Sequence, residues 1–241
     1  MEKERSVMPH EAEGRERAAA AFGIGFVVVG VASFVLITAS PFPSGGASAA
    51  ELTAYFTDPG NGRLIQVAMT LSSVGGFLLL WFLGGLYRRL VGALESGSLL
   101  PLVAFAGGAV FVAVLFAANA VFAALPSDTS GTLGFEPGVA VSLVELTNWL
   151  YTFGVLGFAA TVLATSLAIL RTRVFPRWVA WAGFVFVAVF AANAAFSAFD
   201  APTRASGTLG YELVLWVLVV SVLLLRRSST SVIVPGQQAG N

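Results

Sequence analysis

The chain contains no cysteine, one histidine (His10) and one lysine (Lys3), and only 11% of its 241 residues are charged. Without cysteine there is no disulfide, no thiolate nucleophile and no thiolate metal site. His10 lies in a polar N-terminal stretch, so histidine ligation of haem or zinc inside the apolar segments is excluded as well. The formal net charge is zero, which excludes the basic surface that a nucleic-acid partner requires.

Other marks of catalysis are also missing from the sequence. No aspartate lies in the middle of an apolar run, and no glycine-rich loop of the Walker type is found. None of the expected spans contains a proline, so the broken helices of many secondary transporters lack their usual sign. We therefore expect no enzymatic activity, no cofactor and no metal.

Apolar residues dominate what is present, at 57% of the chain. This fraction is too high for a water-soluble globule of this size, and about 20 apolar residues are enough to cross a bilayer. The sequence predicts an all-α, polytopic transmembrane bundle built of helical hairpins. Its six spans are expected at about 22–39, 64–86, 102–125, 138–170, 178–199 and 209–225.

The segments around these spans complete the expected domain plan. Residues 1–18 read as a solvated cytoplasmic tail, 19–227 as the membrane domain, and 228–241 as a disordered cytoplasmic tail. Ser48 and Glu51 form a capping-box pattern that predicts a short outer helix at about 49–57, lying on the membrane surface. Pro59 to Gly62 are expected to turn the chain inward. The fourth span is long enough that its first two turns should project outward or fold aside.

Arginine and lysine are distributed unequally between the two sides of this topology. Eleven of the thirteen lie in the tails and in the loops on one side, and only Arg63 and Arg204 lie on the other. The positive-inside rule therefore places both termini in the cytoplasm. The opposite side carries seven acidic residues: Glu51, Asp58, Asp128, Glu136, Glu145, Asp200 and Glu212.

An internal repeat links the third and fourth spans to the fifth and sixth. The segment Phe116–Leu125 resembles Phe190–Phe199, and Ser130–Glu136 resembles Ser206–Glu212, at offsets of 74 and 76 residues. Each unit holds an even number of spans, so the two copies should point the same way through the membrane. Whether the first two spans form a third, diverged copy stays open.

Two asparagines of the repeat, Asn119 and Asn193, are expected about 9 Å inside the outer ends of their spans. An amide at that depth needs a hydrogen-bond partner. One interpretation is that each amide joins two helices, at about 1 kcal/mol. The alternative is a pair of ligands for a solute that enters from outside.

A polar stripe in the fourth span joins this alternative. Ser142, Glu145, Asn148 and Thr152 recur at helical spacing near the outer end. Together with the acidic outer face, they suggest a vestibule for a cation or cationic solute, lined by Asn119, Asn193, Glu145 and Asn148. Hydration at the interface is the plain explanation for Glu145.

Small residues at helical spacing predict close helix packing in two spans. They are Ala68, Ser72 and Gly76 in the second span and Gly157, Thr161 and Thr165 in the fourth. Thr132 with Glu136 and Thr208 with Glu212 are read as helix caps.

Three segments carry a family resemblance: Ala50-Glu-Leu-Thr-Ala-Tyr-Phe56, Leu80-Trp-Phe-Leu83 and Pro176-Arg-Trp178. With them the chain resembles small bacterial six-span membrane proteins of unassigned activity. The resemblance implies a bacterial plasma-membrane location and supplies no site residues.

The function expected from these observations is that of a small-solute or ion permease, or of an accessory membrane subunit. The alternative is a structural or sensory membrane protein that binds a partner through its acidic outer loops. Membrane lipid is the expected surrounding. A second copy of the chain or another membrane subunit is the partner class that the sequence leaves open.

Overall fold

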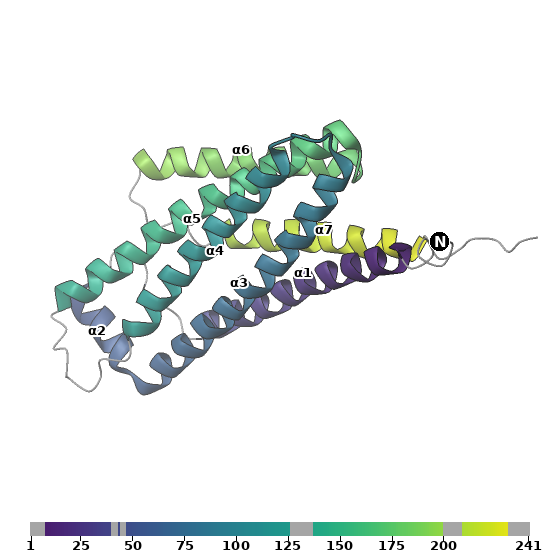
Figure 1. Ribbon diagram of the computed structural model, residues 1–241. Coiled ribbons are helices and arrows are strands. Elements are labelled where there is room, and N and C mark those ends of the chain that lie inside the picture. The colour runs from purple at the N-terminus through teal and green to yellow at the C-terminus, as the bar shows by residue number, and fades with distance from the viewer. Residues whose placement is uncertain (1–7, 40–42, 44–46, 126–136, 200–208, 231–241) are drawn as a thin grey trace, which may run out of the picture.

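Seven α-helices and no strand make up the part of the chain that the computed structural model describes, residues 8–39, 43, 47–125, 137–199 and 209–230. The helices run alongside one another in an elongated bundle (Figure 1). The predicted all-α class is therefore confirmed. The helices are α1 (Met8–Ala39), α2 (Ala49–Thr57), α3 (Pro59–Ala93), α4 (Leu100–Ala124), α5 (Pro137–Thr172), α6 (Arg177–Phe199) and α7 (Leu209–Thr230).

Four of these helices are long and apolar enough to cross a membrane: Gly14–Ala39 of α1, α3, α4, and Gly138–Thr172 of α5. In α6, the stretch Arg177–Ala192 is a shorter apolar helix. The start of α1 and the α3–α4 and α5–α6 connections lie at one end of the bundle, and α2 lies at the other (Figure 1). We call these the arginine end and the α2 end, because Arg15, Arg88, Arg89, Arg171 and Arg173 lie at the first.

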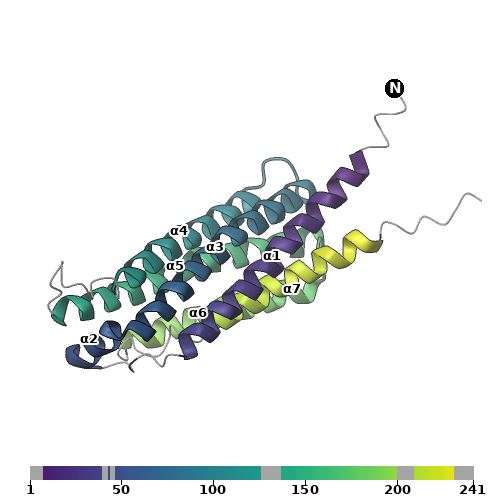
Figure 2. The ribbon, with the colours of Figure 1, turned by 90° about the horizontal axis from the view of Figure 1, so that it is seen from below.

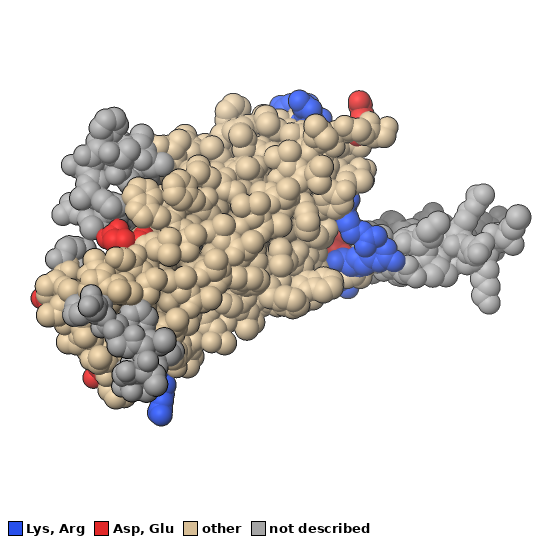
Figure 3. Space-filling model, turned by 60° about the vertical axis from the view of Figure 1, so that its left-hand side comes forward, with Lys and Arg blue, Asp and Glu red and all other residues tan. Residues whose placement is uncertain are grey.

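The flanks of the bundle between these ends are apolar. Large side chains such as Val28, Trp181 and Leu215 are more than half exposed, on α1, α6 and α7 respectively. Figure 3 shows a broad band of uncharged side chains with charged groups toward its margins. Such a continuous apolar surface is not stable in water and suits the hydrocarbon of a bilayer.

Helix α1 begins earlier than expected, at Met8, within the predicted solvated tail. Glu11 and Arg15, and Glu13 and Arg17, stand four residues apart, a spacing at which opposite charges favour a helix. No proline or second glycine follows Gly14 before the apolar run, so nothing stops the helix from continuing into it. The residues of the tail are polar, but those from Met8 onward are helical.

The short helix α2 has the predicted bounds and the predicted cap. The Ser48 amide donates to Glu51 Oε2 at 2.7 Å, and the Glu51 amide donates to Ser48 Oγ at 3.3 Å. Hydrogen bonds from the backbone and hydroxyl of Ser48 stabilise the charged carboxylate and lower the pKa of Glu51 below its ordinary value. The capping box thus fixes the start of α2.

The apolar face of α2 packs against α3 and α5. Leu52 and Phe56 are buried in a cluster with Met69 of α3 and with Ala140 and Val144 of α5. These contacts cover the first turns of α5, which were expected to project outward or fold aside. The apolar face that suggested a surface helix is thus covered by protein, and the position of α2 at a membrane surface stays a prediction.

The chain reverses between α2 and α3 within a single residue, Asp58. Its carboxylate Oδ1 accepts from the Asn61 amide at 2.9 Å, and Pro59 occupies the first turn of α3. Proline suits this position because its missing N–H has no intrahelical partner there. The expected turn over Pro59–Gly62 is therefore the first turn of α3.

Helices α4 and α5 approach until their backbones touch. A Cβ added at Gly157 would lie 2.6 Å from the Gly107 carbonyl oxygen, and one added at Gly107 would lie 2.4 Å from that of Gly157. Beside this contact, Thr161 Oγ1 donates to the Ala104 carbonyl at 2.8 Å. Between α1 and α3, Ser33 Oγ donates in the same way to the Ala68 carbonyl at 2.8 Å. The close packing that the small residues predict is confirmed at these positions.

An aromatic cluster centred on Phe158 joins four helices. Its ring lies 5.5 Å from Phe111 of α4, 6.0 Å from Phe186 of α6 and 5.7 Å from Trp216 of α7, centre to centre. Phe158 is fully buried. Tilted and edge-on contacts of this kind stabilise beyond the burial of area alone.

The two pairs of helices that the sequence repeat relates pack differently. Helix α5 lies against both α4 and α6 over long stretches, whereas α6 and α7 touch only slightly. Helix α7 instead lies along α1, and Figure 2 shows these two side by side. Neighbouring helices therefore follow the order α7, α1, α3, α4, α5, α6 around the bundle.

The contact at Gly157 yields a stability test. Gly157→Leu should destabilise the protein by about 2 kcal/mol or more, because overpacking a close helix contact forces the backbones apart. Gly84→Leu is the matched control, since a Cβ at Gly84 meets nothing within 4 Å. Thermal unfolding in detergent measures both. Equal midpoints for the two variants would contradict the described contact.

Candidate functional site

Asn119 of α4 is the centre of a polar network that joins three helices. Its side-chain amide donates to Ser72 Oγ at 3.0 Å and to Ser73 Oγ at 3.1 Å, both on α3. Its carbonyl Oδ1 accepts from the Tyr151 hydroxyl of α5 at 2.6 Å. Asn119 is only 2% exposed. Both amide protons are therefore used. The residue joins α3, α4 and α5, in line with the interpretation that its amide links helices.

A cavity of about 260 Å³ lies next to this network, where five helices meet. Most of its wall is apolar, and the lining residues carry no charge. Ser72 and Tyr151, which belong to the network, form part of the wall together with Thr152. The other lining residues are Phe26, Gly30, Gly75, Phe111, Leu115, Val155, Leu213 and Val214.

The hydroxyl groups in the wall differ in what they can offer a ligand. Thr152 Oγ1 donates to the Asn148 carbonyl of its own helix at 2.9 Å, so its proton is used. Tyr151 donates to Asn119, which leaves lone pairs on its oxygen. Ser72 Oγ accepts from Asn119 and keeps its own proton among the groups described here. One donor and one acceptor are thus left at the polar part of the cavity.

The residues predicted to line a cation vestibule are only partly brought together. Asn119 is buried in the network, whereas Glu145 and Asn148 are half-buried on α5. None of these three lines the described cavity. The side chain of Asn193 lies outside the described residues, so the expected pairing of the two asparagines stays a prediction.

The polar stripe of α5 has a partly local explanation. Ser142 Oγ donates to the Gly138 carbonyl at 3.0 Å and Thr152 Oγ1 to that of Asn148, so two of its four members bond their own helix. Such bonds satisfy a hydroxyl group in an apolar setting without any ligand. Among the stripe residues, Thr152 alone lines the cavity.

Sequence reasoning missed Tyr151 and the role of Ser72 and Ser73 as partners of Asn119. Tyr151 is one position away from Thr152 of the polar stripe, but it does not share the helical spacing that defined the stripe. Ser72 was read only as a packing residue. Their proximity follows from the close approach of α3, α4 and α5, which no spacing along one helix reveals.

Among the described residues, no three histidine, cysteine, aspartate or glutamate side chains gather. No family model, no curated protein and no solved structure matches the chain.

The network makes a prediction for stability. Tyr151→Phe should cost about 1 kcal/mol, because it removes the donor to a buried amide oxygen. Asn119→Leu should cost more, since it leaves Ser72, Ser73 and Tyr151 without their shared partner. In the double variant the loss should be smaller than the sum of the two single losses.

Unfolding midpoints of the wild type, the two single variants and the double variant in one detergent give this comparison. Thr152→Val serves as the control, because that hydroxyl group bonds its own helix. Strictly additive losses for Asn119 and Tyr151 would show that the two side chains do not interact.

Proposed function

We propose that the chain is an integral protein of a bacterial plasma membrane with six spans, α1 and α3 to α7, and with both termini in the cytoplasm. Four helices long enough to span, and α6 and α7 beside them, support this number. The positive-inside rule supports the orientation, because arginines gather at the end of the bundle where α1 begins. The apolar flanks supply the surface that lipid would cover.

The absence of cysteine allows a direct test of this topology. Thr57→Cys at the α2 end and Ser96→Cys at the arginine end are both at exposed positions. We expect an impermeant maleimide to label the Thr57→Cys variant on intact cells. The Ser96→Cys variant should be labelled only after the cells are opened. The reverse pattern would overturn the orientation, and labelling of both on intact cells would overturn the assignment of the spans.

The duplication of α4–α5 as α6–α7 remains part of the proposal. It is supported by the two sequence matches and by the parallel order in which α4 and α6 begin at the arginine end. Most of the second match lies outside the described residues. Helices α4 and α5 pack closely, whereas α6 and α7 touch only slightly. A duplication would therefore have kept the repeated residues but not the close packing of the two helices in each copy.

We infer that the activity of the protein is to bind a small uncharged molecule inside the bundle, as a permease or an accessory subunit would. The single observation that carries this inference is the cavity at the meeting point of five helices, apolar except for one group of hydroxyls. Ligand sites have this composition, with a few polar groups that orient a mainly apolar ligand.

The wall of the cavity favours a neutral ligand over a cation. A cation taken out of water needs a negative partner or several carbonyl oxygens, and the lining holds no carboxylate. Ser72 supplies one donor and Tyr151 one acceptor, which suits an amide or an alcohol. The volume of about 260 Å³ limits the ligand to roughly the size of a substituted benzene ring.

Benzamide and benzamidinium separate these possibilities because they share a shape and differ in charge. We expect benzamide to raise the thermal midpoint of the purified protein, and benzamidinium to leave it unchanged. Gly30→Leu should abolish the effect of benzamide, since Gly30 lines the cavity and its Cβ would meet only Val214, at 3.9 Å.

Gly84→Leu, which is remote from the cavity lining, is the control and should respond as the wild type does. Stabilisation by benzamidinium that Glu145→Gln removes would favour the cation vestibule instead. If neither compound changes the midpoint, or if Gly30→Leu still responds to benzamide, the proposed ligand class is wrong.

A further inference from the structure

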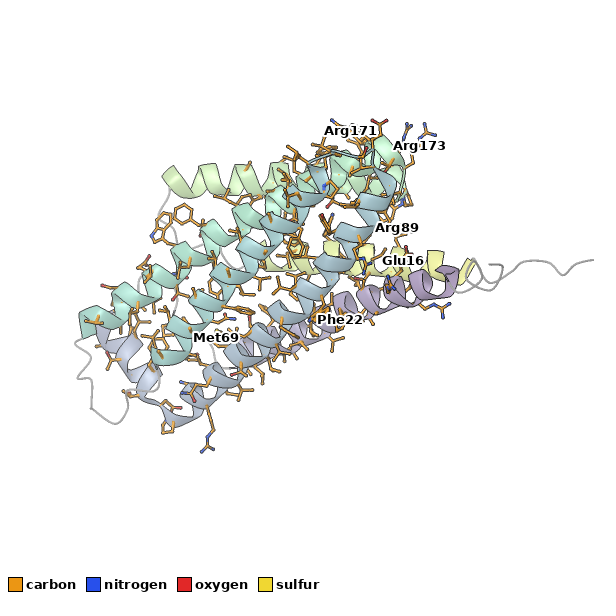
Figure 4. The ribbon with its side chains drawn as sticks, viewed as in Figure 1. Glu16, Phe22, Met69, Arg89, Arg171 and Arg173 are labelled. Atoms are coloured by element: carbon orange, nitrogen blue, oxygen red, sulfur yellow. The ribbon has the colours of Figure 1, made fainter. Side chains whose placement is uncertain are left out.

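A second cavity, of about 560 Å³, lies at the arginine end of the bundle and is lined by charged residues. Four guanidinium groups surround it against one carboxylate. Figure 4 shows Arg89, Glu16, Arg171 and Arg173 gathered at this end, away from Met69, which lies near the α2 end. The lining residues are Arg15, Glu16, Gly85, Arg88, Arg89, Gly92, Ala93, Thr172, Arg173 and Val174.

The wall formed by α1 and α3 is held by a close helix contact. A Cβ added at Gly85 would lie 2.1 Å from the Ala19 Cβ, so only glycine lets the two helices approach there. One turn from this contact, Arg89 Nη1 pairs with Glu16 Oε1. Arg89 Nε is buried with no hydrogen-bond partner among the described groups. Arg89 is therefore fixed in place with one buried donor unused.

Just after α5, the cavity is bordered by a residue with an unusual backbone. Arg173 follows the last turn of α5 with a φ of 55°, and its amide donates to the Ile169 carbonyl at 2.8 Å. Glycine or asparagine is the usual residue in this left-handed position, because the Cβ of other residues crowds the backbone. A residue with this backbone at the border of a charged cavity is a reason to consider a functional site there.

We propose that this cavity binds a phosphate group, through Arg88, Arg89 and Arg173. Guanidinium groups from α3 and from the segment after α5 can contact several phosphate oxygens at once, and each can donate two parallel hydrogen bonds. The missing side chain at Gly92 leaves room, since a Cβ there would meet nothing within 4 Å. The site is separate from the central cavity, so it is a function beyond the one proposed above.

Two sources could supply the phosphate: the headgroup of an anionic phospholipid, or a soluble phosphate compound. The full-length protein in maltoside detergent micelles, which carry no phosphate, tests both sources. In one arm, phosphatidylglycerol is added to the micelles; in the other, inorganic phosphate is added to the buffer. We expect the thermal midpoint to rise in at least one arm, and that arm identifies the source.

Arg88→Gln and Arg173→Gly should each need about ten times more ligand for the same rise in the thermal midpoint. This is the effect of losing a charge-assisted hydrogen bond. Arg173→Gly should also raise the midpoint in detergent without added lipid or phosphate, because glycine relieves the left-handed backbone. The control is Arg63→Gln, an exposed arginine of α3 at the α2 end, which should respond as the wild type does.

A stable Arg173→Gly protein with a weakened response supports the site independently of folding. The proposal is overturned if neither arm raises the midpoint. It is equally overturned if Arg88→Gln and Arg173→Gly respond as the Arg63→Gln control does, since the effect would then come from charge in general.

Discussion

The backbones of α4 and α5 touch at Gly107 and Gly157, and this contact sets the positions of most interior groups. With no side chain between the helices, Thr161 reaches the Ala104 carbonyl and the rings of Phe158 and Phe111 meet. The same pairing of α4 with α5 lets Tyr151 bond Asn119 near the α2 end. A wider spacing would separate these partners, and in an apolar interior the freed polar groups would have no water to replace them.

The hydroxyl groups of the interior differ in their partners. Those of Ser33 and Thr161 donate to backbone carbonyls of a neighbouring helix, whereas those of Thr165, Ser166 and Ser221 are buried with no hydrogen-bond partner among the described groups. Ser72 and Tyr151 are held by Asn119 and still retain hydrogen-bonding capacity at a cavity. The two interpretations of Asn119, as a link between helices and as part of a ligand site, are therefore compatible. The amide joins the helices and also orients the groups that a ligand would contact.

Much of the helical framework could be predicted from the sequence, because apolar runs and capping residues act locally. Ser48 and Glu51 predicted α2, and the small residues Gly157 and Thr161 predicted a close contact. The partner of that contact, the role of Tyr151 and the arginine cavity depend on which helices become neighbours, and no local pattern carries that information. The same holds for α2: its apolar face was recognised from the sequence, but the residues of α3 and α5 that cover it were not.

The first and last helices of the chain meet, as Figure 2 shows, and Ser221 of α7 packs where Gly23 of α1 leaves room. Phe26 and Gly30 of α1 face the central cavity together with Leu213 and Val214 of α7. Because a protein is synthesised from its N-terminus, α1 must wait for the final helix before this part of its surface is covered. The cavity is thus the last part of the bundle to be completed, and a chain that stopped before α7 would leave it open along one side.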